Sequence, residues 1–586
     1  MAVWSQLDVH DQTHRAYAII GVCSTLFCLF SLVLKERLFI GEAITSTICG
    51  IIVGPHALNW IDPLTWGNTE YITQEVSRVV LIIQIFAISV ELPRKYMKTN
   101  WVSVLILLCF TMILGWLVTS AFAFLLFPRL NFAHSLAVTA AITATDPVLA
   151  AAIVGKGKFG ERVPSYLKHL ISAESGANDG LAFPFVLLAV NLLTNRGHPG
   201  IIVRDWICVS LLWECVFGVC LGVVIGFVGR KAMQFCENRG FIDRESLLVI
   251  YIMLSLICTG FGTILGVDDL LVSFAAGGAF AWNGWFTSKI DGQYLSNAID
   301  LLLNTAYFLY FGTIIPWSDF NNHEIGLDWW RLVIWALVVI FLRRIPAVIM
   351  AKPFVPAITT WSEAVFVGHF GPIGVGGIFC CFVTKTLIEA HLGYDLGEVD
   401  IETTPYYIVL RCIWPIVSFT VVTSIIIHGF SVTLIVLFSD YDIVKVRRKQ
   451  RRGSGMITSG QLTEATTMVD TIHLDDLTKD GKQRAQACNT VEVGEGSSTI
   501  HQRPAGHRRV LVGSTQSDDL KFFRIGHELI VEDANENFIK KYRLVHDDDH
   551  EMRLQGLDVG FETSSSNNYD EEELRACILE AMAKQK

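Results

Sequence analysis

The chain of 586 residues is apolar for its length, with 52% hydrophobic residues, 17% charged residues and a mean hydropathy of +0.45. Soluble domains carry about 25% charged residues. Because the apolar residues form blocks long enough to cross a bilayer of about 30 Å, we predict an all-α, multi-pass membrane protein. The net charge of −10 gives no indication of a nucleic-acid partner, since no basic domain stands apart, and we predict none.

The apolar blocks give the order of the predicted elements. The first residues, "MAVWSQLDVHDQTHRAY", lack a basic region and a cleavage site, so we predict no removable signal peptide. About 13 transmembrane helices are then expected, at residues 16–34, 38–55, 77–92, 101–127, 133–154, 167–194, 206–236, 245–265, 267–282, 298–315, 330–351, 361–388 and 404–438. The split between the eighth and ninth rests on the short sequence "LGVDD".

The charges of the connecting loops orient these helices. Loops after odd-numbered segments, including "KGKFGERVPSYLK" and "RRIPAVIMAKP", hold 17 Lys and Arg, whereas loops after even-numbered segments hold only a handful. Basic loops stay on the cytoplasmic side. We therefore expect an extracellular N-terminus and a cytoplasmic C-terminus.

An odd number of spans gives two halves of opposite orientation. Residues 16–194 and 245–438 would then be two inverted repeats joined by the seventh segment. The fifth segment of each half is interrupted near its centre, by "TATDP" in one half and by "GHFGPIGVGG" in the other. Inverted repeats with interrupted helices at matching positions are typical of secondary transporters. We predict two crossing broken helices that form the site.

Two aspartates are expected to meet near the middle of the membrane. Asp179 lies in the sixth segment, about 18 Å from its cytoplasmic end at 1.5 Å per residue. Asp146 reaches a similar depth in the fifth segment. Ser175, one turn before Asp179, faces the same point, and Thr145 offers a hydroxyl and a carbonyl oxygen. Oxygen ligands of this kind suit hard cations such as Na⁺.

Four further polar residues are candidates for supporting roles. Asn178 is expected to support the site by hydrogen bonding, and Glu174 is interpreted equally as part of a structural ion pair or as a functional group. Glu91, at the cytoplasmic end of the third segment, is either a residue of the ion entrance or a solvated helix end. His369, in the twelfth segment, is either a proton-linked group or a packing residue.

Charged residues near the outer ends of helices have simpler interpretations. Asp268 and Asp269 precede the ninth segment, where an N-cap is the simpler interpretation and a site role the alternative. Lys385 and Arg411 are expected to extend toward the membrane surface. Twelve of the 14 cysteines lie in or beside apolar segments, and we interpret them as packing residues rather than metal ligands or disulfides.

The motif "TATDPVLAAAIV" followed by "SAESGANDGLAFPFV" resembles the monovalent cation:proton antiporter family, in particular its fungal plasma-membrane sodium/proton antiporters. The resemblance covers residues 10–440. It implies a homodimer in which one domain holds the dimer contact and the other holds the broken helices. The tail segment "KFFRIGHELIVEDANENFIKKYRLV" is similar to a tail motif of the fungal members.

The resemblance also implies roles for single residues. Asp179 would contact the ion, with Thr145, Asp146 and Ser175 nearby and Glu91 at the cytoplasmic funnel.

One departure concerns the broken twelfth segment. Many relatives have an arginine there, where this chain has Phe370. The usual partner of Glu174 is therefore expected to be missing.

These observations predict a secondary antiporter of the plasma membrane that exchanges cytoplasmic Na⁺ and Li⁺ for external H⁺. Proton and cation would compete at Asp179 with alternating access, in the service of salt tolerance and of pH and cation homeostasis. The alternative is a K⁺/H⁺ exchanger, or one that accepts both cations. A channel is not favoured because the sequence has no selectivity-filter motif, and a receptor is not favoured because the tail has no signalling domain. No enzyme activity and no cofactor are predicted, because no nucleophile–base pair or cofactor loop is found.

The sequence divides into a transmembrane domain, 1–444, and a cytoplasmic tail, 445–586, that is expected to be largely disordered. The tail holds 21 basic and 24 acidic residues and has no apolar block large enough for a core. A short β-like patch is predicted near "FRIGHELIVED". A role in regulation or in binding partner proteins is one interpretation, and a solvated tail is the other.

Overall fold

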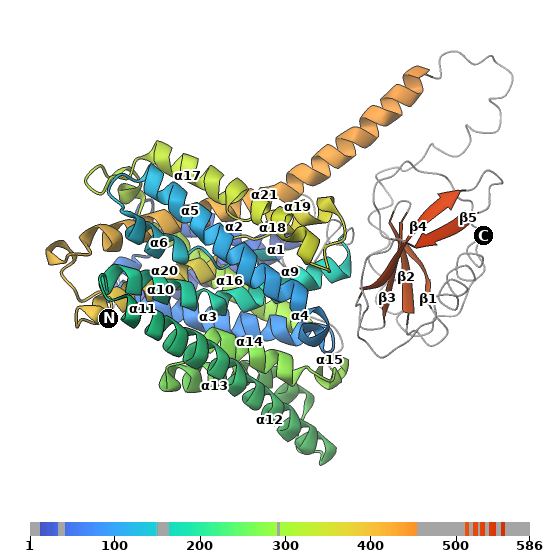
Figure 1. The fold of residues 1–586 in the computed structure, drawn as a ribbon, viewed down its shortest axis with the longest axis horizontal. Helices are drawn as coiled ribbons and strands as arrows, with labels where there is room; N and C mark the ends of the chain where they lie inside the picture. The colour runs from blue at the N-terminus through green and yellow to red at the C-terminus, as the bar shows by residue number, and fades with distance from the viewer. Residues whose placement is uncertain are drawn as a thin grey trace, which may run out of the picture.

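A computed structural model describes most of the predicted membrane domain and five short pieces of the tail. The described residues are 12–32, 41–147, 149–150, 163–289 and 294–453, with 510–514, 520–525, 528–533, 538–546 and 552–556. Helices account for the regular structure up to residue 453, and strands for the tail pieces (Figure 1).

The helices follow the predicted apolar segments. The first half of the chain forms α1 (Gln12–Leu32), α2 (Glu42–Val53), α3 (Thr69–Glu91), α4 (Tyr96–Ile106), the π-helical η4 (Leu107–Thr111), α5 (Met112–Leu126), α6 (Phe132–Ala140), α9 (Ser165–Leu181) and α10 (Phe183–Thr194). The middle forms α11 (Pro199–Arg204), the π-helical η5 (Asp205–Phe217), α12 (Gly218–Asn238), α13 (Arg244–Leu265), α14 (Asp269–Phe280) and α15 (Trp285–Lys289). The remainder forms α16 (Tyr294–Ile314), α17 (Trp329–Leu342), α18 (Ile345–Ala351), α19 (Trp361–His369), α20 (Val375–His391) and α21 (Tyr407–Gly453). Short 3₁₀ turns connect some of them, namely η3 (Pro63–Thr65), η6 (Trp317–Asn321), η7 (Lys352–Phe354) and η8 (Ile401–Thr403).

Each predicted segment contains helix, and α13 and α14 confirm the split around "LGVDD". Within the described part of the chain, six helical stretches have the length and apolar composition needed to cross a membrane: 69–91, 96–126, 165–194, 199–238, 329–354 and 407–431. Other apolar helices are shorter. The number of 13 spans, and the inverted repeats, therefore stay predictions.

Both predicted breaks in the fifth and twelfth segments are confirmed. After α6 the chain is not helical over residues 141–146, and between α19 and α20 it is not helical over residues 370–374. We call these the first and the second unwound segment. Each contains or directly precedes a proline, Pro147 or Pro372, which has no N–H for a helical hydrogen bond.

A third helix is also broken, and this corrects the prediction for "RRIPAVIMAKP". Arg343 and Arg344 separate α17 from α18 and are buried, with 7% and 5% of their surfaces exposed. They are not charges of a cytoplasmic loop, so two of the 17 basic residues that oriented the chain point into the protein instead. Pro346, in the first turn of α18, ends the preceding helix here because its ring is incompatible with a continuous helix.

The helices pack as two groups with a shared middle. In Figure 1, α5, α17, α18 and α19 lie at one side of the bundle and α12 and α13 at the opposite side, with α3, α10 and α20 between them. The α3 helix packs on α13, α14 and α16, whereas α20 packs on α6, α10 and α21, and α3 and α20 touch each other. The broken helices therefore lie inside the bundle, on the α20 side of its middle.

The described tail pieces form one antiparallel sheet. Strands β1 (Val510–Ser514), β2 (Leu520–Ile525), β3 (Glu528–Asp533), β4 (Phe538–His546) and β5 (Met552–Gly556) pair in sequence order. The predicted patch near "FRIGHELIVED" falls on β2 and β3, which pair from Leu520–Asp533 to Ile525–Glu528. The sheet is larger than the short patch that the sequence predicted. The rest of the tail, for which disorder was predicted, lies outside the described residues.

The closest helix contact in the α12 group tests this packing. A Cβ added at Gly226 of α12 would lie 2.1 Å from the carbonyl oxygen of Ala276 in α14, whereas one added at Gly260 of α13 meets nothing within 4 Å. We expect Gly226→Ala to lower the unfolding free energy by roughly 1–3 kcal/mol because the helices must separate. Gly260→Ala, the matched control, should be neutral or slightly stabilising. Thermal unfolding in detergent, followed by tryptophan fluorescence, measures both; equal midpoints would contradict the packing.

Candidate ion-binding site

The two unwound segments bind each other through their main chains. The N–H of Asp146 donates to the carbonyl oxygen of Pro372 at 2.7 Å. The Asp146 carboxylate accepts from the N–H of Leu149 at 2.9 Å and from the N–H of Val375 at 3.1 Å. These donors lie where helix resumes after each unwound segment, so one carboxylate stabilises the positive ends of two helical pieces.

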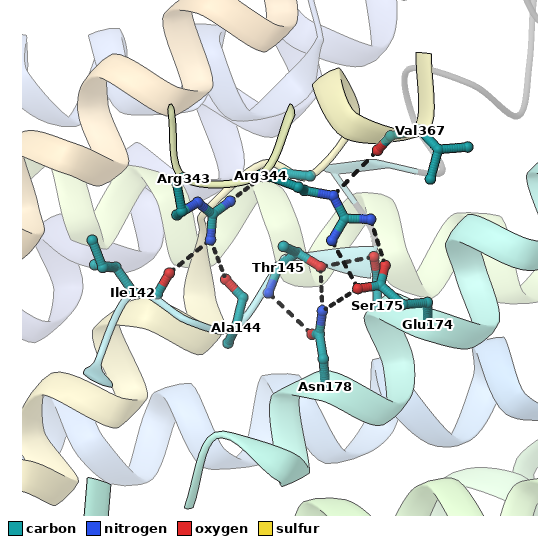
Figure 2. Close-up of polar contacts among 10 residues, drawn as sticks. Ile142, Ala144, Thr145, Glu174, Ser175, Asn178, Arg343, Arg344 and Val367 are labelled. Carbon is teal, nitrogen blue, oxygen red and sulfur yellow. Dashed lines mark hydrogen bonds and ion pairs between the residues drawn. The ribbon is translucent and has the colours of Figure 1, made fainter. Parts of the chain in front are cut away.

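A cluster of hydrogen bonds joins the first unwound segment to α9. The hydroxyl oxygens of Thr145 and Ser175 lie 3.0 Å apart (Figure 2). The N–H of Thr145 donates to Asn178 Oδ1 at 3.0 Å, and Asn178 Nδ2 donates to Thr145 Oγ1 at 2.6 Å and to Glu174 Oε1 at 3.2 Å. Asn178 therefore ties Thr145 and Glu174 together from one turn of α9.

Asp179 is the carboxylate that these bonds leave free. It is fully buried, and neither of its oxygens has a hydrogen-bond partner among the described residues. It lies against the start of α20, where a Cβ added at Gly376 would be 2.3 Å from Asp179 Oδ1. A Cβ added at Gly374 would similarly be 2.1 Å from Asp146 Oδ2. Glycine is needed at both positions because the two carboxylates occupy the space of a side chain.

The surroundings of Asp179 are acidic. Asp146, Glu174 and Asp268 are close enough to repel it electrostatically. An ionised carboxylate that is buried without a partner is very unfavourable. Asp179 is therefore stable in two forms: with a bound proton, or with a cation beside it.

Glu174 has a partner, which corrects the expectation drawn from Phe370. The Nη1 and Nη2 atoms of Arg344 donate to the two carboxylate oxygens of Glu174 at 2.7 and 2.8 Å, and Arg344 Nε donates to the carbonyl oxygen of Val367 at 3.2 Å (Figure 2). The arginine comes from the break between α17 and α18 rather than from the second unwound segment. Phe370 is buried there and packs on Phe366, with ring centroids 4.5 Å apart.

Arg343 binds the carbonyl groups of both unwound segments. Its Nη1 donates to the carbonyl oxygens of Ile142 at 2.7 Å and Ala144 at 3.4 Å, and its Nη2 donates to that of Gly371 (Figure 2). Carbonyl groups at the C-terminal ends of helices carry partial negative charge. Arg343 therefore complements the ends of α6 and α19 as Asp146 complements the helical pieces that follow.

His369 lies at the end of α19, beside α21. Its carbonyl oxygen accepts from Nε2 of His428 at 3.0 Å, and the two rings are 5.2 Å apart. Ser424, one turn earlier on α21, accepts from the N–H of Ile373 at 2.7 Å. The α21 helix thus holds the second unwound segment, and the two histidines line a small pocket with Arg343. The proton-linked role of His369 stays a prediction.

Asp268 and Asp269 differ in their contacts. Asp268 is the N-cap of α14, where its Oδ1 accepts from the N–H of Leu271 at 3.0 Å. Its Oδ2 is buried and points at Gly180, 3.1 Å from the position of an added Cβ. Asp269 instead forms an ion pair with Arg78 of α3 at 3.1 Å.

The remaining predicted residues lie away from Asp179. Glu91 is exposed at the end of α3, and Arg411 is exposed near the start of α21. The prediction that Lys385 extends to the membrane surface is wrong, because Lys385 is 2% exposed and forms an ion pair with Glu70. The partner of Lys385 is Glu70 at the start of α3, which the sequence around Lys385 does not reveal.

Arg343 and Arg344 are the site residues that the sequence analysis missed. Their signal is the string "RRIP", two charges and a proline at the end of an apolar run, which is the same kind of interruption as in the fifth and twelfth segments. The apolar run that ends at this string was interpreted as part of a transmembrane segment that a basic loop follows.

Comparison with known proteins agrees with this geometry. A family model described as sodium/hydrogen exchanger, transmembrane, matches residues 22–438. The chain belongs to the sodium/hydrogen exchanger family. It is therefore a multi-pass membrane protein.

Relatives within the family include fungal proteins. The chain is 55% identical over 439 residues to Na(+)/H(+) antiporter 2 of Zygosaccharomyces rouxii, which covers 74% of this chain and 54% of that protein. It is 41% identical over 450 residues to a Na(+)/H(+) antiporter of Schizosaccharomyces pombe, covering 76% of this chain and 95% of that one. The chain thus spans about half the length of the Zygosaccharomyces relative.

A solved structure shares the fold. The sodium proton antiporter MjNhaP1 from Methanocaldococcus jannaschii superposes with a TM-score of 0.53, covering 72% of this chain and all of that one at 18% identity. The helical architecture with broken helices is therefore that of this exchanger fold.

The ion pair of Glu174 gives a test of the site's architecture. We expect Arg344→Met to lower the unfolding free energy by about 3–5 kcal/mol, because it leaves the Glu174 carboxylate buried and alone. The double variant Glu174→Gln, Arg344→Met should lose less than Arg344→Met does. Thermal unfolding in detergent gives both values.

A matched control removes an exposed ion pair. Arg204, 67% exposed beside Asp205, should tolerate Arg204→Met with a loss below about 1 kcal/mol. Glu174→Gln is also measured alone. If the double variant lost as much unfolding free energy as Glu174→Gln and Arg344→Met lose together, Glu174 and Arg344 would not act as a pair.

Proposed function

We propose that this protein is a secondary antiporter that exchanges cytoplasmic Na⁺ for external H⁺, with Asp179 as the shared binding group. The observation that carries the proposal is the pair of buried Asp179 oxygens without a hydrogen-bond partner among the described residues. The names of the fungal relatives, Na(+)/H(+) antiporters, support Na⁺ as the cation.

The geometry supports an all-oxygen site for a small cation. Asp179 would supply the charge, and the hydroxyls of Ser175 and Thr145, 3.0 Å apart, would supply neutral oxygens from the same face. Asp146 would contribute mainly the electrostatic attraction of its negative charge rather than a direct ligand, since both of its oxygens accept hydrogen bonds from the main chain. Na⁺ and Li⁺ suit such oxygen ligands.

Exchange follows from occupancy of one carboxylate. Because a bare Asp179 is unfavourable in this buried acidic setting, release of a proton requires arrival of a cation, and release of the cation requires arrival of a proton. Antiport then needs no second coupling device. Movement of one helix group against the other would expose the site to each side of the membrane in turn.

The wider setting is part of the same proposal. The protein would act as a homodimer in the plasma membrane, with an extracellular N-terminus and the tail sheet in the cytoplasm. It would use the inward proton gradient to expel Na⁺ and Li⁺, and so serve salt tolerance and pH homeostasis. The tail, residues 445–586, would bind regulatory proteins. Glu91 would lie at the cytoplasmic entrance.

Removal of the Asp179 charge tests the shared site. Asp179→Asn keeps the shape of the side chain but neither takes up a proton nor balances a cation, so we expect Na⁺-dependent proton flux to fall to the background of empty vesicles. Proteoliposomes that contain a pH-sensitive dye measure this flux. Asp243→Asn is the control, since Asp243 is an exposed N-cap of α13 and asparagine caps equally well. Flux near the wild-type rate in Asp179→Asn would refute the proposal.

The pH dependence of Na⁺ affinity tests competition. Below the pKa of the shared carboxyl group, the apparent Michaelis constant for Na⁺ should rise about tenfold for each unit by which cytoplasmic-side pH falls, while the maximal rate changes much less. Na⁺ titrations in the same vesicles at several pH values measure both constants. A Michaelis constant that stays flat from about pH 6 to 8 while the rate falls would indicate a separate protonation switch, for which His369 is the candidate. His369→Ala would then remove the pH dependence of the rate.

A further inference from the structure

One stripe of α3 is bound to α20 by polar contacts. Glu70, Gln74 and Arg78 are four residues apart and lie on one face of α3. Glu70 pairs with Lys385, and Gln74 Oε1 accepts from the hydroxyl of Thr386 at 2.7 Å.

Arg78 on this face and Asn68 at the start of α3 make two further contacts. The guanidinium of Arg78 lies 5.2 Å from the ring centroid of Phe379 in α20. Asn68, the N-cap of α3, donates from Nδ2 to the carbonyl oxygen of Leu396 in the loop after α20. Four successive levels of α3 are therefore bound to α20 or its following loop.

These contacts join the two helix groups. On one side α3 is bonded to α14 and α16: Arg78 pairs with Asp269 at 3.1 Å, and the Ser77 and Tyr307 hydroxyls are 2.7 Å apart. On the other side α20 is the second half of a broken helix and carries Gly376 against Asp179. A movement that exposes Asp179 between these groups has to break the contacts of the α3 stripe.

The contacts lie between Asp179 and one face of the membrane. Lys385 is nine residues after Gly376 in α20, or about 14 Å along the helix axis. Cys380 and Cys381 occupy the level between them and are buried. Cys381 lies near Lys385, and Cys380 lies near Asp179. The face concerned is the one at which α3 begins and α20 ends, which the loop charges predict to be external.

We propose that Glu70–Lys385 and Gln74–Thr386 form a latch that keeps this face closed and that opens in each transport cycle. The inference rests on the proposed function, since it assumes alternating access to Asp179. The latch is the contact set that distinguishes a closed outer face from an open one.

Lys385 has a second carboxylate available when the latch opens. Glu389 is four residues further along α20, on the same helix face. It interacts electrostatically with Lys385, its Oε2 accepts from the N–H of Gly397 at 2.7 Å, and its Oε1 is buried without a hydrogen-bond partner in the described chain. When α3 and α20 separate, Lys385 can leave Glu70 and pair with Glu389. The lysine then stays paired in both states, so the opening carries no cost of an unpaired buried charge and can readily reverse.

The buried native cysteine beneath the latch reports its state. The full-length protein is reconstituted in vesicles and treated from one side at a time with a membrane-impermeant thiol reagent, and the modification of Cys381 is followed by peptide mass spectrometry. Wild-type Cys381 should react slowly. Lys385→Met should raise its rate about tenfold or more from the external side only, because the closed state loses its ion pair.

Two further variants separate loss of the latch from loss of the fold. Glu70→Gln removes the pair between α3 and α20 but leaves Lys385 paired with Glu389. It should give the same increase in the rate of Cys381 modification without leaving a buried charge unpaired. The charge exchange Glu70→Lys, Lys385→Glu, made together with Glu389→Gln so that no two carboxylates face each other on α20, should return the rate to within about threefold of wild type, because it restores the pair. Arg331→Met is the control: it removes a pair with Asp328 inside one helix group and should leave the rate unchanged.

The readout does not depend on transport. An unchanged rate of Cys381 modification in Lys385→Met and Glu70→Gln would overturn the latch, even if Na⁺-dependent proton flux were present. Equal rates for the charge exchange and for Lys385→Met would also overturn it. Absence of flux in the wild type would instead refute the proposed antiport, whatever the rate of modification.

Discussion

The structure depends on binding the backbone groups that broken helices leave unpaired inside an apolar protein. In a membrane these N–H and C=O groups have no water to bind, and each one left unsatisfied costs several kcal/mol, roughly 2–7. Here the N–H groups bind the Asp146 carboxylate, and the carbonyl groups bind the Arg343 guanidinium. The two side chains have opposite charge and bind opposite helix ends. The carboxylate accepts hydrogen bonds from the N–H groups, and the guanidinium donates hydrogen bonds to the carbonyl groups.

This use of Asp146 explains why Asp179 has a different role. Two aspartates meet at the crossing, but the oxygens of Asp146 are bonded to the main chain, whereas those of Asp179 have no hydrogen-bond partner among the described residues. In the proposed antiport, a carboxylate that holds the architecture could not also exchange its partner in every cycle. The structure thus holds one aspartate that is fixed by main-chain hydrogen bonds and one that has none, against Gly374 and Gly376 respectively.

The buried ion pairs are distributed in a similar way. Glu174 and Arg344 are both in the group of helices around the broken segments, with the carboxylate fully buried, and their pair stabilises that group as a unit. Glu70 and Lys385 come from α3 and α20, which meet in the shared middle of the bundle and otherwise pack on different helices, and Glu70 remains 31% exposed. A pair within a group makes it rigid, whereas a pair between groups sets the energy of separating them. In the proposed antiport, these locations would suit a rigid unit that moves against a partner.

Much of the fold and of the site could be predicted from the sequence. The apolar runs predicted where helices lie, and the strings "TATDP" and "GHFGPIGVGG" predicted the two breaks, because proline and clustered glycine act on the backbone locally. The similar depth of Asp146 and Asp179 in their segments, and the four-residue spacing of Ser175 and Asp179, predicted that these residues and Thr145 lie close together. The helices and these two breaks were predictable because they depend on neighbours along one helix, and the hydrogen bond between the Thr145 and Ser175 hydroxyls agrees with the expected proximity.

The contacts between distant helices were decided by the tertiary structure. The partner of Glu174 is 170 residues away in sequence, and that of Lys385 is 315 away. The sequence shows that a buried charge needs a partner but not which helix brings one, since any of several arginines or glutamates satisfies the composition. Arg344 was assigned to a loop and Lys385 to the membrane surface for this reason. The sequence alone determined the helices, the breaks in the fifth and twelfth segments and the acidic residues at the crossing; only the packing of the helices decided which aspartate lacks a hydrogen-bond partner among the described residues, because that depends on which backbone groups arrive beside it.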